Sequence, residues 1–174
     1  YGGIKKYQWV ATPLAVHGVV FLKNGKKVSF SIGEKEEDPV FCIPDILPHL
    51  SKNVQDDRKT REVIKGEELK VLFGSIPVKD KDTKEKIKAN ILEHLKKVYG
   101  IEEDDFFSSE IEIVPALKAR DIGLDRGMIG AYGQDDRICA YTSLKALLDV
   151  KKPEKTILCY FADKEEVGSD GSTG

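Results

Sequence analysis

The first strong pattern along the chain is a pair of runs rich in β-branched residues, separated by a short polar stretch. The runs occupy 14–22 and 27–32, and Asn24-Gly25 lies between them. Asn-Gly in this position is the strongest short-range signal for a β-hairpin, because both residues tolerate positive φ. The pattern therefore predicts two antiparallel strands, over 14–22 and 27–32, joined by a tight turn.

The next part of the chain is more polar and carries fewer apolar anchors. Pro44 and Pro48 argue against a long helix and predict a short one that begins near either proline. The stretch 51–68 has few apolar residues and is typical of an exposed connection. Apolar residues become frequent again over 67–78, where we expect strand structure.

The clearest helical pattern follows Asp82. Apolar residues recur there at helical spacing and form one face: Ile87, Ile91, Leu95 and Val98. Asp82 and Glu85 match a capping pair at the beginning of this helix, and Gly100 provides its stop. The alternating run 108–116 predicts a half-buried strand, so residues 14–114 form an α+β module.

The last third of the chain predicts a second amphipathic helix, which follows an acidic pair and ends at Lys151-Lys152-Pro153. Its apolar side consists of Ile138, Tyr141, Leu144 and Leu148. The continuous apolar run 155–162 then predicts a strand buried on both faces of a parallel sheet. A helix followed by a buried strand indicates an open α/β sheet.

Composition narrows the classes of partner. The 174 residues are 40% hydrophobic and 33% charged with a net charge of −2, so no field is present that would attract nucleic acid or anionic lipid. The longest apolar runs fall far short of the roughly 20 residues that a membrane helix needs. We therefore expect neither a nucleic-acid nor a membrane partner, and a cytoplasmic location.

The cysteines and the chain ends add two expectations. Cys42, Cys139 and Cys159 are an odd number without close pairing, which fits a reducing compartment. The chain begins at Tyr1 without a methionine and ends on a glycine-rich stretch. We expect it to be a piece of a longer protein.

An acidic pair is the first candidate for chemistry. Asp135 and Asp136 lie where the chain enters the second predicted helix. Carboxylates there are also common helix caps, because they accept backbone N–H bonds and suit the positive end of the helix dipole. The sequence alone leaves both interpretations open, with capping the more common one.

A second acidic pair, Glu165 and Glu166, follows the predicted buried strand, where open α/β sheets place their ligand crevice. Adjacent carboxylates repel unless a cation neutralises one or its pKa is raised. A bound metal would use one carboxylate as a ligand and leave the other to accept a proton from water. An ordinary solvated turn is the alternative.

The three histidines are scattered through the chain. His17 lies in a predicted strand and His94 beside the apolar face of a predicted helix, so both are expected to be structural. His49 lies in a loop framed by prolines and is the best candidate among them for a functional role.

Several spaced motifs together resemble the aspartyl aminopeptidase and vacuolar aminopeptidase I family of dinuclear zinc exopeptidases. The resemblance rests on IGAYGQDDRICAYTSL and FADKEEVGSDGSTG, and also on YGGIKKYQWVATPLAVHGVV, IPDILPHL and VPALKARDIGLDRGMIGAYG. These motifs follow the family's order and cover nearly the whole chain. The resemblance implies a metal-dependent aminopeptidase that removes N-terminal amino acids from peptides.

The resemblance also implies roles for residues at matching positions. Asp135, rather than Asp136, would bridge two metal ions, and the peptide bond after the bridging aspartate is often cis in related enzymes. Glu165 would be the general base and Glu166 a metal ligand. The metals would be two divalent ions, zinc or else cobalt or manganese, since carboxylate and imidazole ligands accept all three.

The fold implied by the resemblance is an open mixed-sheet catalytic domain with an inserted α+β dimerisation and lid domain. Residues 1–12 and 116–174 would be catalytic-domain pieces, and 13–115 the inserted domain. His49 would reach into the active site of a neighbouring subunit, to act on the substrate or in catalysis. A homo-oligomer built from dimers, up to a dodecamer, is implied as well.

Part of the family's ligand set has no counterpart in this sequence. The family takes further ligands from an upstream His-x-Asp motif and from a downstream aspartate and histidine, and the chain contains neither region. The segment alone is therefore expected to be inactive. The alternative function is an oligomerisation or scaffold module without activity of its own. The preference for acidic or for apolar N-terminal residues stays open.

Overall fold

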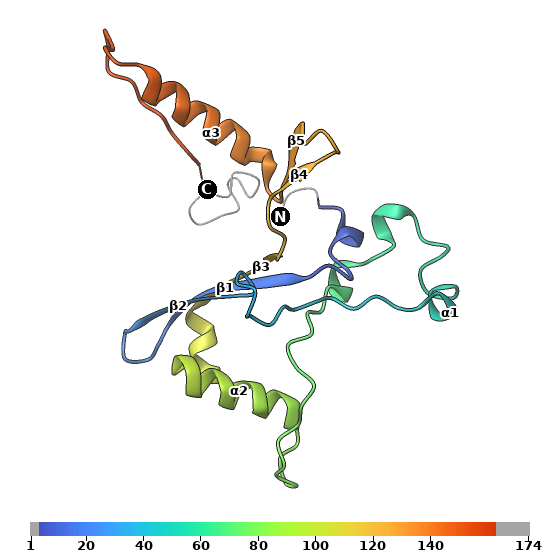
Figure 1. Ribbon diagram of the computed structural model, residues 1–174. Helices are drawn as coiled ribbons and strands as arrows, with labels where there is room; N and C mark the ends of the chain where they lie inside the picture. Colours follow the sequence, from blue (N-terminus) through green and yellow to red (C-terminus); the bar gives the residue numbers. More distant parts are fainter. Residues whose placement is uncertain (1–3, 163–174) are drawn as a thin grey trace. The chain divides into compact units, whose positions relative to one another are not determined.

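The structure is a computed structural model that describes residues 4–162. The chain divides into two units, one of residues 5–116 and the other of residues 117–174 with 1–4 (Figure 1). No helix among the described residues is long and apolar enough to cross a membrane. Residues 5–12 belong to the first unit because Val10 bridges to Ile43. The limits of the predicted inserted domain, 13–115, stay a prediction.

An antiparallel sheet with strand order β2-β1-β3 organises the first unit. Its strands are β1 (Leu14–Phe21), β2 (Lys27–Ile32) and β3 (Ser109–Pro115). The predicted hairpin is confirmed: Gly25 adopts a φ of 82°, and the Lys26 N–H donates to Asn24 Oδ1 at 2.9 Å. The predicted strand over 108–116 is confirmed as β3, which pairs with β1 although about ninety residues separate them.

Helix α2 (Lys86–Tyr99) is the predicted first helix and contacts this sheet through Tyr99. The ring of Tyr99 lies against that of Phe30 with centroids 5.2 Å apart, and Phe30 in turn lies over Gly18. Gly100, with a φ of 72°, ends the helix as expected. Leu14, Val16, Val20 and Ile101 are fully buried and form the centre of this core.

The predicted capping pair of α2 is wrong. The helix begins at Lys86 with Glu85 at the N-cap position and without a side-chain cap. The residues before it form a local turn, because Asp80 accepts hydrogen bonds from the Thr83 hydroxyl at 2.6 Å and the Asp82 N–H at 3.2 Å. This turn holds Asp82 outside the helix.

Short helical turns and loops complete the first unit. They are η1 (Lys6–Gln8), α1 (Pro48–Ser51), η2 (Thr60–Glu62), η3 (Gly66–Glu68) and η4 (Glu103–Ser108). The short helix predicted near a proline is confirmed at Pro48. The strand structure expected over 67–78 is wrong, since only an isolated bridge between Leu72 and Cys42 forms there. No described neighbouring strand continues that bridge into a ladder.

The two ends of the sheet-bearing module lie side by side. Leu14 opposes Pro115 in the pairing of β1 with β3, and the Ala116 N–H donates to the Pro13 carbonyl at 2.8 Å. The chain therefore enters and leaves this module at adjacent points.

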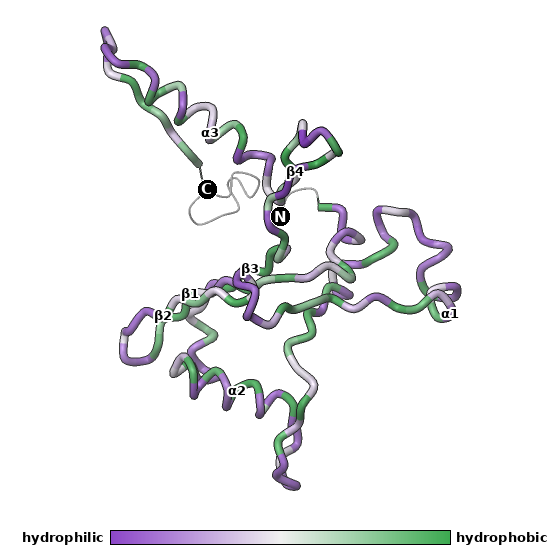
Figure 2. Tube along the Cα trace, viewed as in Figure 1, coloured by the Kyte–Doolittle hydropathy of each residue, from purple (hydrophilic) through white to green (hydrophobic). Residues whose placement is uncertain are grey.

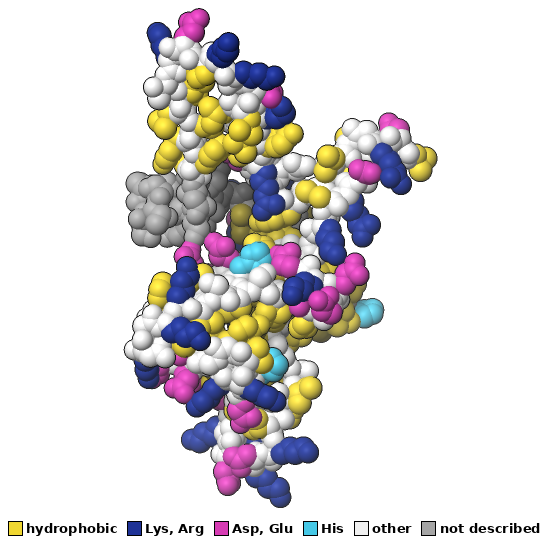
Figure 3. All heavy atoms as spheres, turned by 60° about the vertical axis from the view of Figure 1, so that its left-hand side comes forward, with side chains coloured by type: hydrophobic (Ala, Val, Ile, Leu, Met, Phe, Trp, Pro, Cys, Tyr) yellow, Lys and Arg dark blue, Asp and Glu magenta, His cyan; other side chains and the backbone are white. Residues whose placement is uncertain are grey.

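The second unit contains a small hairpin and a long helix. Strands β4 (Arg120–Ile122) and β5 (Met128–Gly130) pair antiparallel, and α3 (Gln134–Asp149) is the predicted second helix. Its predicted apolar side is confirmed as a stripe of exposed side chains. Hydrophobic residues recur along this helix and the segment after it (Figure 2), and yellow side chains gather in the corresponding upper part of Figure 3.

The strand predicted over 155–162 is not formed in the described part of the chain. Those residues have no regular structure, and Leu158 and Tyr160 are 88% and 82% exposed. A strand that is apolar on both sides needs a neighbouring strand and a covering layer. The described residues supply neither at this place, so this prediction is wrong for the structure.

Candidate functional site

The entry to α3 is the most distinctive backbone in the second unit. Gly133 precedes the helix in the left-handed region, with a φ of 77°, and Gln134 donates its side-chain amide to the Ile129 carbonyl at 3.1 Å. Asp135 then leaves helical geometry, with φ −89° and ψ 109°. The peptide bond between Asp135 and Asp136 is cis, as the family resemblance implies.

Both aspartates expose their side chains, and neither acts as a conventional helix cap. Among residues 4–162, no backbone N–H donates to the carboxylate of Asp135 or of Asp136. No lysine or arginine in the described ranges forms an ion pair with either of them. The capping interpretation therefore finds no support in this geometry, and two adjacent carboxylates lack a described counter-ion.

Cys139 lies one helical turn beyond Asp135 and Asp136, and it interacts differently with the two carboxylates. A hydrogen bond with the Asp136 carboxylate, the charge of Asp136 and burial together raise the pKa of the Cys139 thiol. The Asp136 carboxylate leads these causes, whereas Asp135 acts on the thiol through its charge alone and accepts no hydrogen bond from the described residues. The sequence analysis missed this contact, although the i, i+3 spacing of Asp136 and Cys139 was a usable signal.

The other predicted site residues lie elsewhere. Glu165 and Glu166 fall outside the described residues. His49 is the second residue of α1 and belongs to the first unit, where it is exposed between the exposed Leu47 and Leu50. Asp45 stabilises the approach to this helix, because its Oδ1 accepts from the Ile46 N–H at 2.8 Å and from the Gln55 side-chain amide at 3.3 Å.

The donor chemistry at the entry to α3 fits part of a metal site. Carboxylate oxygens are accepted ligands of zinc, and of harder divalent ions such as manganese. Within residues 4–162 no group of three or more His, Cys, Asp or Glu side chains is close enough to hold an ion. Asp135 and Asp136 thus supply at most one side of such a site, and its other ligands have to come from other residues.

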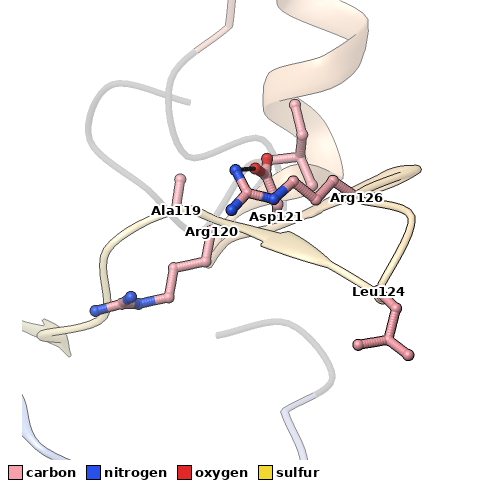
Figure 4. A pocket seen from close by; sticks show the side chains of 7 residues that line it. Ala119, Arg120, Asp121, Leu124 and Arg126 are labelled. Carbon is pink, nitrogen blue, oxygen red and sulfur yellow. Dashed lines mark hydrogen bonds and ion pairs between the residues drawn. The ribbon is translucent and has the colours of Figure 1, made fainter.

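A pocket of about 720 Å³ that the sequence analysis did not identify lies beside the β4–β5 hairpin (Figure 4). Arg126 turns toward Asp121, with 3.5 Å between its guanidinium and the carboxylate, whereas Arg120 points away from this pair. Leu124 stands fully exposed at the tip of the hairpin. The pocket is open and belongs to the hairpin that leads the chain toward Asp135.

Comparison with known proteins gives a match over the full chain. The family model described as aminopeptidase I zinc metalloprotease (M18) matches residues 1–174. A probable M18 family aminopeptidase 1 from Borrelia garinii is 59% identical over an alignment of 175 positions, which covers 100% of this chain and 38% of the relative. Its counterpart from Thermotoga maritima is 56% identical over 174 residues, again 100% of this chain and 38% of the relative.

Solved structures agree with these sequence matches. The crystal structure of an M18 family aminopeptidase from Thermotoga maritima covers 100% of this chain with a TM-score of 0.91 and 55% identity, and this chain covers 38% of it. The mApe1 dodecamer of S. cerevisiae shares the fold, with a TM-score of 0.52 and 18% identity over 90% of this chain and 34% of its own. The chain spans about 38% of the length of the relatives first named.

Proposed function

This chain belongs to the aminopeptidase I zinc metalloprotease (M18) family, and we propose that it is part of an enzyme that removes N-terminal amino acids from peptides. The observation that carries the proposal is identity above 50% along the entire chain to M18 aminopeptidases. The alternative, a scaffold module without activity, would not require the acidic residues of these motifs. Peptides are the proposed substrates.

Within the enzyme, we assign Asp135 as the carboxylate that holds metal. Its side chain is exposed and receives no hydrogen bond from the described residues, whereas Asp136 is engaged by the Cys139 thiol. Asp135 is thus the member of the pair with both oxygens available, and Asp136 and Cys139 would keep the entry to α3 in place. Two zinc ions, or cobalt or manganese, are the proposed occupants, with Glu166 as a further ligand.

The proposed chemistry divides between the metals and one side chain. When bound, divalent ions would polarise the scissile carbonyl and acidify a water molecule. Glu165 would accept the proton of the attacking water and return it to the leaving amine, acting first as general base and then as general acid. These two glutamates lie outside the described residues, so their roles rest on the sequence motif.

We propose that residues 13–115 form the dimerisation and lid domain, and that the pieces 1–12 and 116–174 belong to an open-sheet catalytic domain. His49 would contact the substrate in the active site of a neighbouring subunit. Its exposed position between apolar side chains, on a short helix outside the sheet, supports this assignment.

A dimer-based homo-oligomer, up to a dodecamer, and a cytoplasmic location complete the proposal. The free cysteines Cys42, Cys139 and Cys159 support a reducing compartment.

The test uses the full-length protein that contains this chain. Release of the N-terminal residue from Asp- and Leu-initiated peptides is measured with and without a chelator, followed by addition of zinc, cobalt or manganese. We expect chelation to abolish release and metal to restore it, and the peptide panel to identify the preferred residue. Absence of release with every metal would favour the scaffold function instead.

Two substitutions separate the proposed roles. Glu165→Gln should retain the metal content of the parent while kcat falls by about 10²- to 10⁴-fold, because general base catalysis contributes that much. Asp135→Asn should lower metal content as well as activity. Asp136→Asn is the matched control and should lose less metal, since its carboxylate is engaged by Cys139. Equal metal loss in both aspartate variants would contradict the assignment of Asp135.

A further inference from the structure

The outer strand β2 presents a regular edge of backbone groups. Leu22 and Lys26 close the hairpin through a hydrogen bond from the Leu22 N–H to the Lys26 carbonyl at 2.9 Å. Hydrogen-bonded and non-hydrogen-bonded pairs alternate along an antiparallel ladder, so this contact determines which of the following residue pairs are hydrogen-bonded. Val28, Phe30 and Ile32, which oppose Val20, Gly18 and Val16, turn their backbone groups toward β1.

The backbone groups of the intervening residues, Lys27, Ser29 and Ser31, therefore point away from β1. In the described part of the chain no other strand lies beside them, because β2 is the outer strand of the sheet. No further backbone hydrogen bond involves these three residues within that part. An unpaired edge of this kind is a template for a strand of another chain.

Charge is distributed unevenly at the two ends of this edge. The hairpin before β2 carries Lys23, Lys26 and Lys27, while the loop after it reads Gly-Glu-Lys-Glu-Glu-Asp over residues 33–38. Lys23 is paired with Asp104 at 2.7 Å, so Lys26 and Lys27 supply the positive charge of the first end, while the other end carries a net negative charge. A second β2 strand in antiparallel orientation would place each basic end beside an acidic end, whereas a parallel one would bring like charges together.

We propose that the β2 edge pairs with the β2 edge of a second copy of this chain, antiparallel and about a two-fold axis at Ser29. In this register Ser29 lies opposite Ser29 of the partner subunit, and Lys27 lies opposite Ser31 of the partner subunit. Each of the three outward-facing residues then exchanges two hydrogen bonds with its opposite residue. The inference rests on the proposal that residues 13–115 form the dimerisation domain, and it names the strand through which two copies pair.

The apolar face of the strand agrees with the same register. Val28 would lie opposite Phe30 of the partner subunit, and Phe30 opposite Val28 of the partner subunit. Both side chains are now half-buried at the margin of the core under α2, and Phe30 already contacts Tyr99. Pairs of an aromatic and a β-branched residue are among the favourable cross-strand contacts, so the pairing would bury this margin on both subunits.

The first test is cysteine cross-linking in the full-length protein. In Ser29→Cys the two introduced thiols would lie on opposed residues with Cα atoms about 5.5 Å apart, which a disulfide can span. Lys27→Cys is the matched control, because its two copies would lie about 13 Å apart along the strands. The parent protein, with its own cysteines, defines the background.

The expected result is an intermolecular disulfide in Ser29→Cys under mild oxidation and background cross-linking in Lys27→Cys. A mixture of Lys27→Cys and Ser31→Cys should cross-link between the two variants, because these positions oppose each other. Ser29→Cys that cross-links no faster than Lys27→Cys would overturn the proposal. Equal cross-linking at all three positions would overturn the register and with it the two-fold pairing.

The second test exchanges the charges at the two ends. The double variants K26E/K27E and E36K/E37K should each weaken self-association by about tenfold or more, because like charges then meet at both ends. Mixing the two variants should restore association to the strength of the parent, since every end again meets its opposite. Sedimentation velocity measures both effects.

The mixing step distinguishes an interface from loss of folding. A variant that had unfolded would not recover on mixing with a second one, and circular dichroism provides an independent check. If both variants associate like the parent, or if mixing fails to restore the association of folded variants, the β2 edge is not the interface.

Discussion

Gly18→Ala should be one of the most costly single-methyl additions in this chain. Gly18 lies in the middle of β1, opposite Phe30 of β2, and a Cβ atom built there would lie 2.2 Å from the nearest carbon of the Phe30 ring. Two further ring carbons would lie at 2.5 and 2.7 Å. Such distances are far below van der Waals contact, so the ring has to move by more than about 1 Å.

The ring cannot move without losing a second contact. It packs against Tyr99 of α2 with a centroid distance of 5.2 Å, an arrangement worth about 0.5–1.5 kcal/mol beyond its buried area. Overpacking of a well-packed core costs about 1–3 kcal/mol. The sum predicts that Gly18→Ala destabilises this sheet by about 1.5–4.5 kcal/mol, which corresponds to an increase of about 10- to 2,000-fold in local opening.

Hydrogen exchange followed by mass spectrometry is the suitable assay, because it reports local opening in a protein of more than one unit. Peptides that cover β1 and β2 should exchange faster in Gly18→Ala than in the parent. Gly66→Ala is the matched control, since nothing lies within 4 Å of its added Cβ and its φ is not positive. That variant should leave exchange unchanged or slow it slightly.

A double substitution identifies the cause. In the background of Phe30→Ala the ring is absent, so adding Gly18→Ala should cost less than about 1 kcal/mol. If Gly18→Ala raised exchange by less than about tenfold, or cost as much without the ring as with it, the contact between Gly18 and Phe30 would not be the source of the strain, and the packing argument would be refuted.

Three further predictions concern polar groups. Asp105 is 5% exposed and accepts two backbone N–H bonds, so Asp105→Ala should destabilise the first unit by about 1–3 kcal/mol in denaturant unfolding, and a loss below 0.5 would contradict this role. In protein treated with a chelator, Asp136→Asn should lower the raised pKa of the Cys139 thiol, because the neighbouring anion is removed. The thiol should then be alkylated faster at pH 7.5, and an unchanged alkylation rate would exclude the contact. A hydrogen bond from the Lys35 N–H is the largest of the causes that lower the pKa of Asp38. The ionised carboxylate therefore stabilises the fold above its unfolded pKa, and this stabilisation is lost as pH falls through the lower folded pKa. In a profile of stability against pH, Asp38→Asn should reduce the fall in stability on the acid side.

Local patterns in the sequence predicted the elements that depend on local rules. The hairpin follows from Asn24-Gly25, and the end of α2 follows from Gly100, because each needs only a glycine or an adjacent pair that tolerates positive φ. The pairing of β1 with β3 has no local signal, since it joins distant segments. Asp82 failed as a cap because Asp80 forms a competing turn, which spacing alone does not reveal.

The candidate site was predictable only in part, for a physical reason. The positions of Asp135 and Asp136 at a helix entry follow from the helical pattern that begins after them. The strand expected over 155–162 depends on neighbouring strands that the described residues do not include, so its apolar pattern finds no partner. The contact between Cys139 and Asp136 lies within one helical turn, and a search for titratable pairs at that spacing would have found it.

The adjacency of Pro13 and Ala116 bears on how such a module is acquired and exchanged. Because the chain enters and leaves the module at neighbouring points, joining the module to a surrounding fold would cost no more chain entropy than closing one short loop. Under the proposed domain arrangement, residues 13–115 would be exchangeable between relatives as a cassette, because the chain enters and leaves them at adjacent points.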